Sequence, residues 1–140
     1  MGRFRDLAAW VVAILLAGAF LLTGGMKLAG SPAIVEAFRH WGFTPGFVTL
    51  IGVVEVVGAA LSLFPATALY GALLIGAVMV GALATHLSHG EWAMAIVPLA
   101  LGLLAAWLAT LRRPDAFGLG ALQRPHEFVS TEPERHDDLF

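Results

Sequence analysis

The sequence predicts an all-α membrane protein: a transmembrane four-helix bundle with a short interfacial helix between the first and second spans. Hydrophobic residues make up 59% of the 140 residues and charged residues only 13%, and mean hydropathy is +0.83. The charges also leave long gaps. Residues 7–26 and 92–111 are runs of twenty without Asp, Glu, Lys or Arg, and residues 56–90 are a run of thirty-five. A soluble fold of this size could not bury so much apolar surface, so we expect the lipid bilayer to be its solvent.

Four spans follow from these runs. The first is expected over residues 7–28, and it is longer than the core of a secretory signal, which is about 7–15 residues, so it is read as an uncleaved anchor. The second and third are expected over residues 46–64 and 66–87, with Pro65 ending the second. The fourth is expected over residues 92–111, with a kink at Pro98. Residues 1–111 would then form the membrane domain and residues 112–140 a polar, partly disordered tail.

A short helix is expected between the first two spans, within residues 29–45. Ser31 and Pro32 can cap and start it, and its apolar residues Ile34, Val35 and Phe38 lie on one side. We expect it to lie at the membrane interface.

The basic residues predict the orientation, because cytoplasmic flanks are enriched in Lys and Arg. Four basic residues flank the spans on the side that holds both termini: Arg3, Arg5, Arg112 and Arg113. The other side has only Lys27 and Arg39. We therefore expect a multi-pass protein of the cytoplasmic membrane with both termini in the cytoplasm.

Composition excludes several functions. The chain has no Cys, which excludes disulfides, thiolate metal sites and a cysteine nucleophile. The net charge is −2 and the basic residues are scattered, so nucleic acid is not an expected partner. The many glycines lie within apolar runs, where they let membrane helices approach closely, and form no nucleotide-binding motif.

Glu55 is the residue that most needs an explanation, because a charge near the centre of the bilayer costs about 2.5–3.5 kcal/mol on insertion scales. It lies about 13–14 Å into the second span, at a rise of 1.5 Å per residue. Its helix face carries the small residues Gly52, Ala59 and Ser62, which suits a face turned toward other helices. Either the carboxyl is neutral at this depth or a cation pairs with it.

Lys27 and His86 are the candidate companions of Glu55. Lys27 ends the first span, where a lysine either snorkels to the interface or turns inward to form a site. His86 ends the third span on the same side, either as a hydrogen-bonded packing residue or as part of the site. His86 and His89 share one helix end, so a haem held between two histidines is not expected. His86, Glu55 and Glu91 have no metal-ligand spacing, so no metal is expected either, and Glu91 is read as a solvated loop charge.

The chain resembles the DoxX family of small four-helix membrane proteins over residues 5–111. Four segments carry the resemblance: Gly24-Gly25-Met26-Lys27-Leu28, the stretch from Ala37-Phe38 to Gly42-Phe43, Gly52-Val53-Val54-Glu55, and Ala84-Thr85-His86. The acidic tail after Arg112-Arg113-Pro114 departs from the family pattern.

The resemblance implies a redox-associated membrane component, since the family takes its name from a subunit linked to quinone-coupled sulfur oxidation. It makes Lys27, Glu55 and His86 the ligand-binding candidates, with Lys27 and His86 donating to the carbonyl oxygens of a quinone and Glu55 relaying protons. We expect no cofactor resident in the chain, a quinone as ligand, and no complete enzyme without a separate redox subunit.

Two other functions stay open from the sequence. One is a non-catalytic accessory subunit of a larger membrane complex, which small-residue helix faces would serve. The other is a small proton-coupled exporter, acting as a homodimer.

Overall fold

The computed structural model describes residues 2–116 and contains five helices in this part of the chain. They are α1 (Gly2–Leu28), α2 (Pro32–His40), α3 (Pro45–Ser62), α4 (Ala68–Ser88) and α5 (Trp92–Ala116). All but α2 are long and apolar enough to cross a membrane, α5 over its part up to Arg113. The predicted all-α fold, with four spans and a short helix between the first two, is confirmed.

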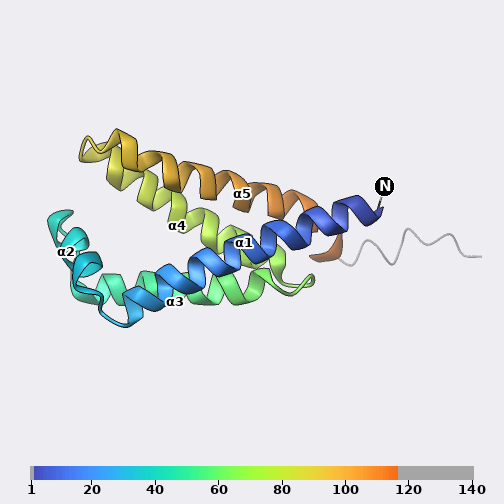
Figure 1. Ribbon diagram of the computed structural model, residues 1–140, viewed down its shortest axis with the longest axis horizontal. Coiled ribbons are helices and arrows are strands. Elements are labelled where there is room, and N and C mark those ends of the chain that lie inside the picture. The colour runs from blue at the N-terminus through green and yellow to red at the C-terminus, as the bar shows by residue number, and fades with distance from the viewer. Residues whose placement is uncertain (1, 117–140) are drawn as a thin grey trace, which may run out of the picture.

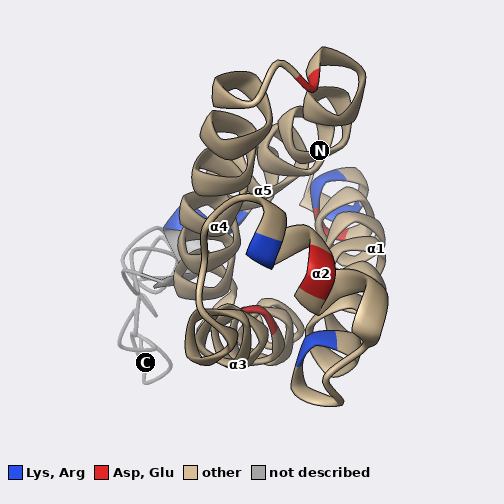
Figure 2. Ribbon diagram, turned by 90° about the vertical axis from the view of Figure 1, so that its left-hand side faces the viewer, with Lys and Arg blue, Asp and Glu red and all other residues tan. Residues whose placement is uncertain are grey.

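Both Gly2 and Ala116 lie at one end of the bundle, and α2 lies at the other (Figure 1). We call these the terminal end and the α2 end. Seen from the α2 end, α2 lies across the space between α1 and the pair formed by α4 and α5 (Figure 2).

The helix bounds differ from the predicted ones where polar residues continue or end a helix. α1 begins at Gly2, five residues before the apolar run. α3 ends at Ser62 and α4 begins at Ala68, because hydrogen bonds within the intervening turn satisfy backbone groups there. In that turn the Thr67 hydroxyl donates to the carbonyl oxygen of Leu61 at 2.9 Å.

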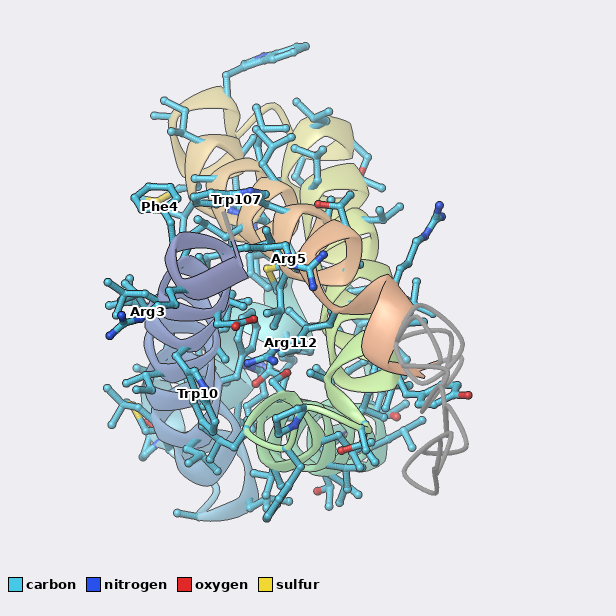
Figure 3. All side chains as sticks on the ribbon, turned by 90° about the vertical axis from the view of Figure 1, so that its right-hand side faces the viewer. Arg3, Phe4, Arg5, Trp10, Trp107 and Arg112 are labelled. Atoms are coloured by element: carbon cyan, nitrogen blue, oxygen red, sulfur yellow. The ribbon has the colours of Figure 1, made fainter. Side chains whose placement is uncertain are left out.

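α5 continues to Ala116, beyond residue 111, where the fourth span was expected to end. The reason is a tertiary contact: Arg112 is 5% exposed, and its guanidinium lies 5.4 Å from the ring centre of Trp10 in α1. Figure 3 shows Arg112 turned inward at the terminal end, on the side of α1. The predicted disorder of the rest of the tail concerns residues 117–140, which lie outside the described residues.

Three helices that end at the α2 end close with the same turn. After α1, α2 and α4 the chain passes through a glycine with positive φ: Gly30, Gly42 and Gly90. In each case the residue after the glycine donates its backbone N–H to a carbonyl five residues earlier, as in Phe43 to Phe38 at 2.9 Å and Glu91 to His86 at 2.9 Å. This is the Schellman motif, which folds the residue after the glycine back over the last turn of the helix.

The start of α2 follows the prediction in one respect only. Pro32 is its first residue, but the Ser31 side chain makes no capping hydrogen bond. The backbone carbonyl of Ser31 accepts instead from Ile34 and Val35, each at 3.0 Å. α3 has the hydroxyl cap that α2 lacks, since Thr44 Oγ1 accepts from the backbone N–H of Phe47 at 3.3 Å.

Two glycine contacts set where the helices cross. α1 and α3 cross closely at Gly24 and Gly52, where a Cβ added to Gly24 would lie 3.0 Å from the Gly52 carbonyl oxygen. α3 and α4 cross closely at Gly58 and Gly71, where a Cβ on Gly71 would lie 2.6 Å from the Gly58 carbonyl oxygen. The first contact lies toward the α2 end and the second toward the terminal end, so α1 and α3 separate from α4 and α5 toward the α2 end (Figure 1).

The apolar core fills the remaining part of the bundle. Its buried residues include Leu16 and Phe20 of α1, Ile75 of α4 and Leu108 of α5. The lipid-facing sides of the helices carry the exposed apolar residues, as expected where hydrocarbon is the solvent.

Candidate functional site

A cavity of about 690 Å³ occupies the space that opens between the helices toward the α2 end. Phe20 and Met79, which belong to the buried core, form part of its floor. Aromatic residues of α2, the loop after it and the start of α3 line the cavity on the other side: Phe38, Trp41, Phe43 and Phe47. Lys27, Glu55 and His86 all line this one cavity, so the structure brings the three sequence candidates together.

The aromatic lining is an ordered cluster. The rings of Phe43 and Phe47 stack at 4.7 Å between centroids, and Phe38 packs against Phe43 at 5.8 Å and against Trp41 at 5.4 Å. The Schellman turn at Gly42 creates the contact between Phe38 and Phe43, because these residues hold the two positions that this motif brings together. This lining was not predicted from the sequence.

Lys27 turns inward and pairs with Glu55. Its ammonium donates to both carboxylate oxygens, at 2.8 and 3.0 Å, and the two side chains are only 10% and 3% exposed. Of the two explanations that the sequence left for Glu55, the structure shows the cation partner. The close crossing of the helices makes the pair possible, since a Cβ on Gly52 would lie 2.9 Å from the Cβ of Lys27.

Thr23 joins Lys27 and Glu55 in one polar cluster and was not among the candidate residues predicted from the sequence. Its hydroxyl donates to Glu55 Oε2 at 3.2 Å. Its position was a usable signal, because residues four apart lie on the same face of a helix, and Thr23 precedes Lys27 by four.

His86 forms a second polar cluster, which joins α4 to the loop after α2. His86 Nδ1 lies 2.7 Å from Glu91 Oε2, and the indole N–H of Trp41 donates to Glu91 Oε1 at 3.3 Å. The ring of Trp41 also packs edge-on against His86, with centroids 5.0 Å apart. Because an ionised carboxylate can only accept a hydrogen bond, His86 Nδ1 carries the proton in this contact.

Glu91 is a loop charge, as expected, but it is only partly solvated and its carboxylate has partners. The Schellman turn at Gly90 folds Glu91 back over His86, and its side chain is 29% exposed. The hydrogen bond from His86, with a smaller contribution from Trp41, lowers the pKa of the Glu91 carboxyl below its usual value of 4.5. The sequence signal for this contact was Gly90, because a glycine just after the end of a helix is typical of the Schellman motif.

The other polar residues near the α2 end are on the surface. Glu36 and Arg39 form an exposed ion pair within α2, at 2.8 Å. His89 is exposed and its Nδ1 lies 2.9 Å from the Thr85 carbonyl oxygen. Within residues 2–116, no three His, Asp or Glu side chains are grouped so that they could hold a metal ion.

The cavity therefore has an apolar lining with two polar clusters. One is a buried ion pair reinforced by Thr23, and the other is an imidazole held by a carboxylate. Such a cavity can surround an apolar ring or chain and hydrogen-bond polar atoms on it.

A family model described as the DoxX-like family matches residues 11–108. The chain belongs to the DoxX-like family. The match begins in α1, ends in α5 and includes Lys27, Glu55 and His86. Comparison with curated proteins and with solved structures gives no match. The family assignment of this DoxX-like chain thus rests on its membrane domain. The function of its site is inferred from the geometry of that site.

Proposed function

We propose that this protein is a redox-associated membrane component that binds a quinone-like lipophilic molecule in the cavity lined by Lys27, Glu55 and His86. The observation that carries the proposal is one cavity, about 690 Å³ in volume, that combines an apolar and aromatic lining with two hydrogen-bonding clusters. Its size lies within the range of about 300–1,000 Å³ that is usual for small-molecule sites.

The polar groups suit carbonyl oxygens. An ammonium has three N–H donors, and Lys27 uses two hydrogen bonds for Glu55, so one donor remains for a ligand. On the other wall, His86 uses Nδ1 for Glu91, and its Nε2 makes no hydrogen bond to any described residue. The aromatic lining favours a flat ring, since rings pack well by offset stacking or edge-on contact. In this proposal a separate membrane redox partner exchanges electrons with the bound molecule.

The orientation that we propose places the terminal end in the cytoplasm. Arg3, Arg5 and Arg112 all lie at this end, together with Trp10 and Trp107 (Figure 3). Lys27 is occupied by Glu55 inside the bundle, which leaves Arg39 as the basic surface residue of the α2 end among the described residues. The bias of basic residues therefore favours a cytoplasmic terminal end. The cavity then lies in the outer half of the cytoplasmic membrane.

Binding can be tested by tryptophan quenching with a short-chain ubiquinone added to the protein in lipid nanodiscs. We expect saturable quenching that is largely lost in Trp41→Phe, because Trp41 lines the cavity. The matched control is Trp107→Phe, whose exposed indole lies away from the cavity and whose removal should leave the saturable part unchanged. Glu55→Gln and His86→Ala should each weaken binding about tenfold or more, the usual cost of a lost hydrogen bond to a charged group. Wild-type affinity in both variants would overturn the proposal.

The exporter interpretation has less support from the geometry. A transport path needs polar groups on both sides of the membrane centre. The cavity is instead lined by Phe20 and Met79 of the buried core, and the core residues Leu16 and Leu108, which do not line it, lie closer to the terminal end. The accessory-subunit alternative is tested by native mass spectrometry of the protein from membranes, where a stoichiometric protein partner without quinone would favour it.

A further inference from the structure

We infer that His86 is the group that exchanges protons with the ligand in this cavity, and that Glu91 positions His86 and stabilises its charged form. This inference rests on the proposed function, because it assigns a role within the same cavity. It differs from the sequence hypothesis, in which Glu55 relays protons.

Glu55 is poorly placed to exchange a proton. Both of its carboxylate oxygens accept from Lys27, and Oε2 also accepts from Thr23. Its side chain is 3% exposed, so water reaches it only through the cavity. Protonating Glu55 would leave the Lys27 ammonium without its counter-ion in an apolar setting, which is costly. This ion pair suits a fixed role: it holds the ammonium at the cavity wall.

His86 has the opposite properties. Its ring lines the cavity, its side chain is 17% exposed, and one of its two nitrogens is unoccupied by the described residues. With the proton on Nδ1 donated to Glu91, the neutral imidazole presents the lone pair of Nε2.

Glu91 supplies what the charged imidazole needs. Its carboxylate lies 2.7 Å from Nδ1 and is held in place by the Trp41 indole, so it can stabilise an imidazolium without moving. Its side chain is 29% exposed, which gives the pair contact with water at the α2 end. The other titratable groups nearby are His40 of α2, whose ring lies 6.1 Å from that of His89, and the Lys27–Glu55 pair across the cavity.

The exchange involves a proton and no electrons. When a ligand hydroxyl ionises, its O–H bond breaks, an N–H bond forms at His86 Nε2, and the imidazole becomes an imidazolium next to the ionised Glu91. The reverse step returns the proton to the ligand oxygen. The ligand class is therefore a lipophilic ring with an ionisable hydroxyl or a basic oxygen, such as a hydroquinone or a hydroxyquinone.

Calorimetry with lawsone, a hydroxynaphthoquinone that is an anion at neutral pH, tests this assignment. Titrations of the protein in nanodiscs in two buffers of different ionisation enthalpy give the number of protons taken up per bound anion. Wild type should take up about one proton, because the imidazolium is the form that pairs with the anion. His86→Gln should bind with uptake close to zero, and Glu91→Gln should bind with reduced uptake. The matched control His89→Gln should behave like wild type, because His89 is exposed and bonds to the α4 backbone.

The outcomes separate the two proposals. If lawsone and ubiquinone both fail to bind, the proposed function is wrong. If they bind but proton uptake survives in His86→Gln and disappears in Glu55→Gln, the cavity stands as a quinone site and the assignment to His86 is wrong. A nitrogen NMR spectrum of His86 gives an independent reading that does not require binding: Nδ1 should carry the proton in wild type and lose that preference in Glu91→Gln.

Discussion

Lys27→Met and Glu55→Gln should destabilise the protein unequally, although each removes one half of the same ion pair. The ammonium lies 2.8 Å from the nearer carboxylate oxygen. The gross attraction at that distance is about 6 kcal/mol at an effective dielectric constant of about 20, and the cost of removing both charges from water offsets most of it. Removing one partner of such a pair leaves the other without its counter-ion, which typically costs about 3–5 kcal/mol.

The structure predicts which partner tolerates isolation. Lys27→Met leaves Glu55 buried in the middle of α3 with only the Thr23 hydroxyl, so we expect the full cost of about 3–5 kcal/mol. Glu55→Gln leaves Lys27, which is the penultimate residue of α1 and can extend its chain to the interface. The amide of the new glutamine also keeps one acceptor oxygen. We expect a loss of about 1–2 kcal/mol for this variant.

The double variant completes the cycle. With both charges gone, Lys27→Met combined with Glu55→Gln should be less destabilised than Lys27→Met alone, by about 2 kcal/mol or more. The assay is reversible unfolding by dodecyl sulfate in maltoside micelles, followed by tryptophan fluorescence. Arg39→Gln, which breaks the exposed pair on α2, is the matched control and should unfold like wild type. Equal costs for the two single variants, or a double variant whose cost is their sum, would refute the interpretation.

Two further predictions concern packing and pH. Gly71→Ala should destabilise the bundle by about 1–3 kcal/mol in the same assay, because the new Cβ would lie 2.6 Å from backbone atoms of Gly58 and Ser62; Gly76→Ala, which meets nothing within 4 Å, should not destabilise it. Because folding lowers the pKa of Glu91 below its usual value of 4.5, its carboxylate stabilises the fold above that pH, and the contribution is lost as the pH falls through the lowered pKa. Unfolding midpoints should therefore fall more in wild type than in Glu91→Gln as the pH is lowered below 4.5, and parallel curves in that range would contradict this.

The spans were predictable because they depend on composition. A run of about twenty apolar residues has few alternatives to a membrane helix. The errors in their bounds arose where tertiary contacts extend a helix through polar residues. Arg112 is the clearest case, since it continues α5 by packing against Trp10 of α1. No local sequence pattern predicts that contact.

The direction of Lys27 was not decidable from the sequence. A lysine at the end of a span has good solvation at the interface. It turns inward here because Gly24 and Gly52 let α1 and α3 approach closely enough for its ammonium to reach Glu55. That approach depends on two residues far apart in the chain.

The contact between His86 and Glu91 was, in contrast, available from local sequence. Gly90 follows the end of the third span at the position where a positive φ closes a helix, and the motif places the next residue over the last turn. Reading Glu91 only as a charge in a loop missed this geometry. The aromatic lining around Phe38 depends on the same motif at Gly42, which local sequence indicates, and on the tertiary position of α3, which it does not.

The cavity follows from the different depths of the two glycine crossings. If Gly24–Gly52 and Gly58–Gly71 lay at the same depth, α1, α3 and α4 would run together along their full lengths and side chains would fill the space. Because the first crossing lies toward the α2 end and the second toward the terminal end, α3 leaves α4 as it approaches α1. The Lys27–Glu55 pair then stabilises the α1–α3 contact at the level of the opening, while His86 and Glu91 tie α4 to the loop after α2 across it. The same side chains that line the cavity therefore hold its walls in place, so a ligand that bonds to them would find a site already formed.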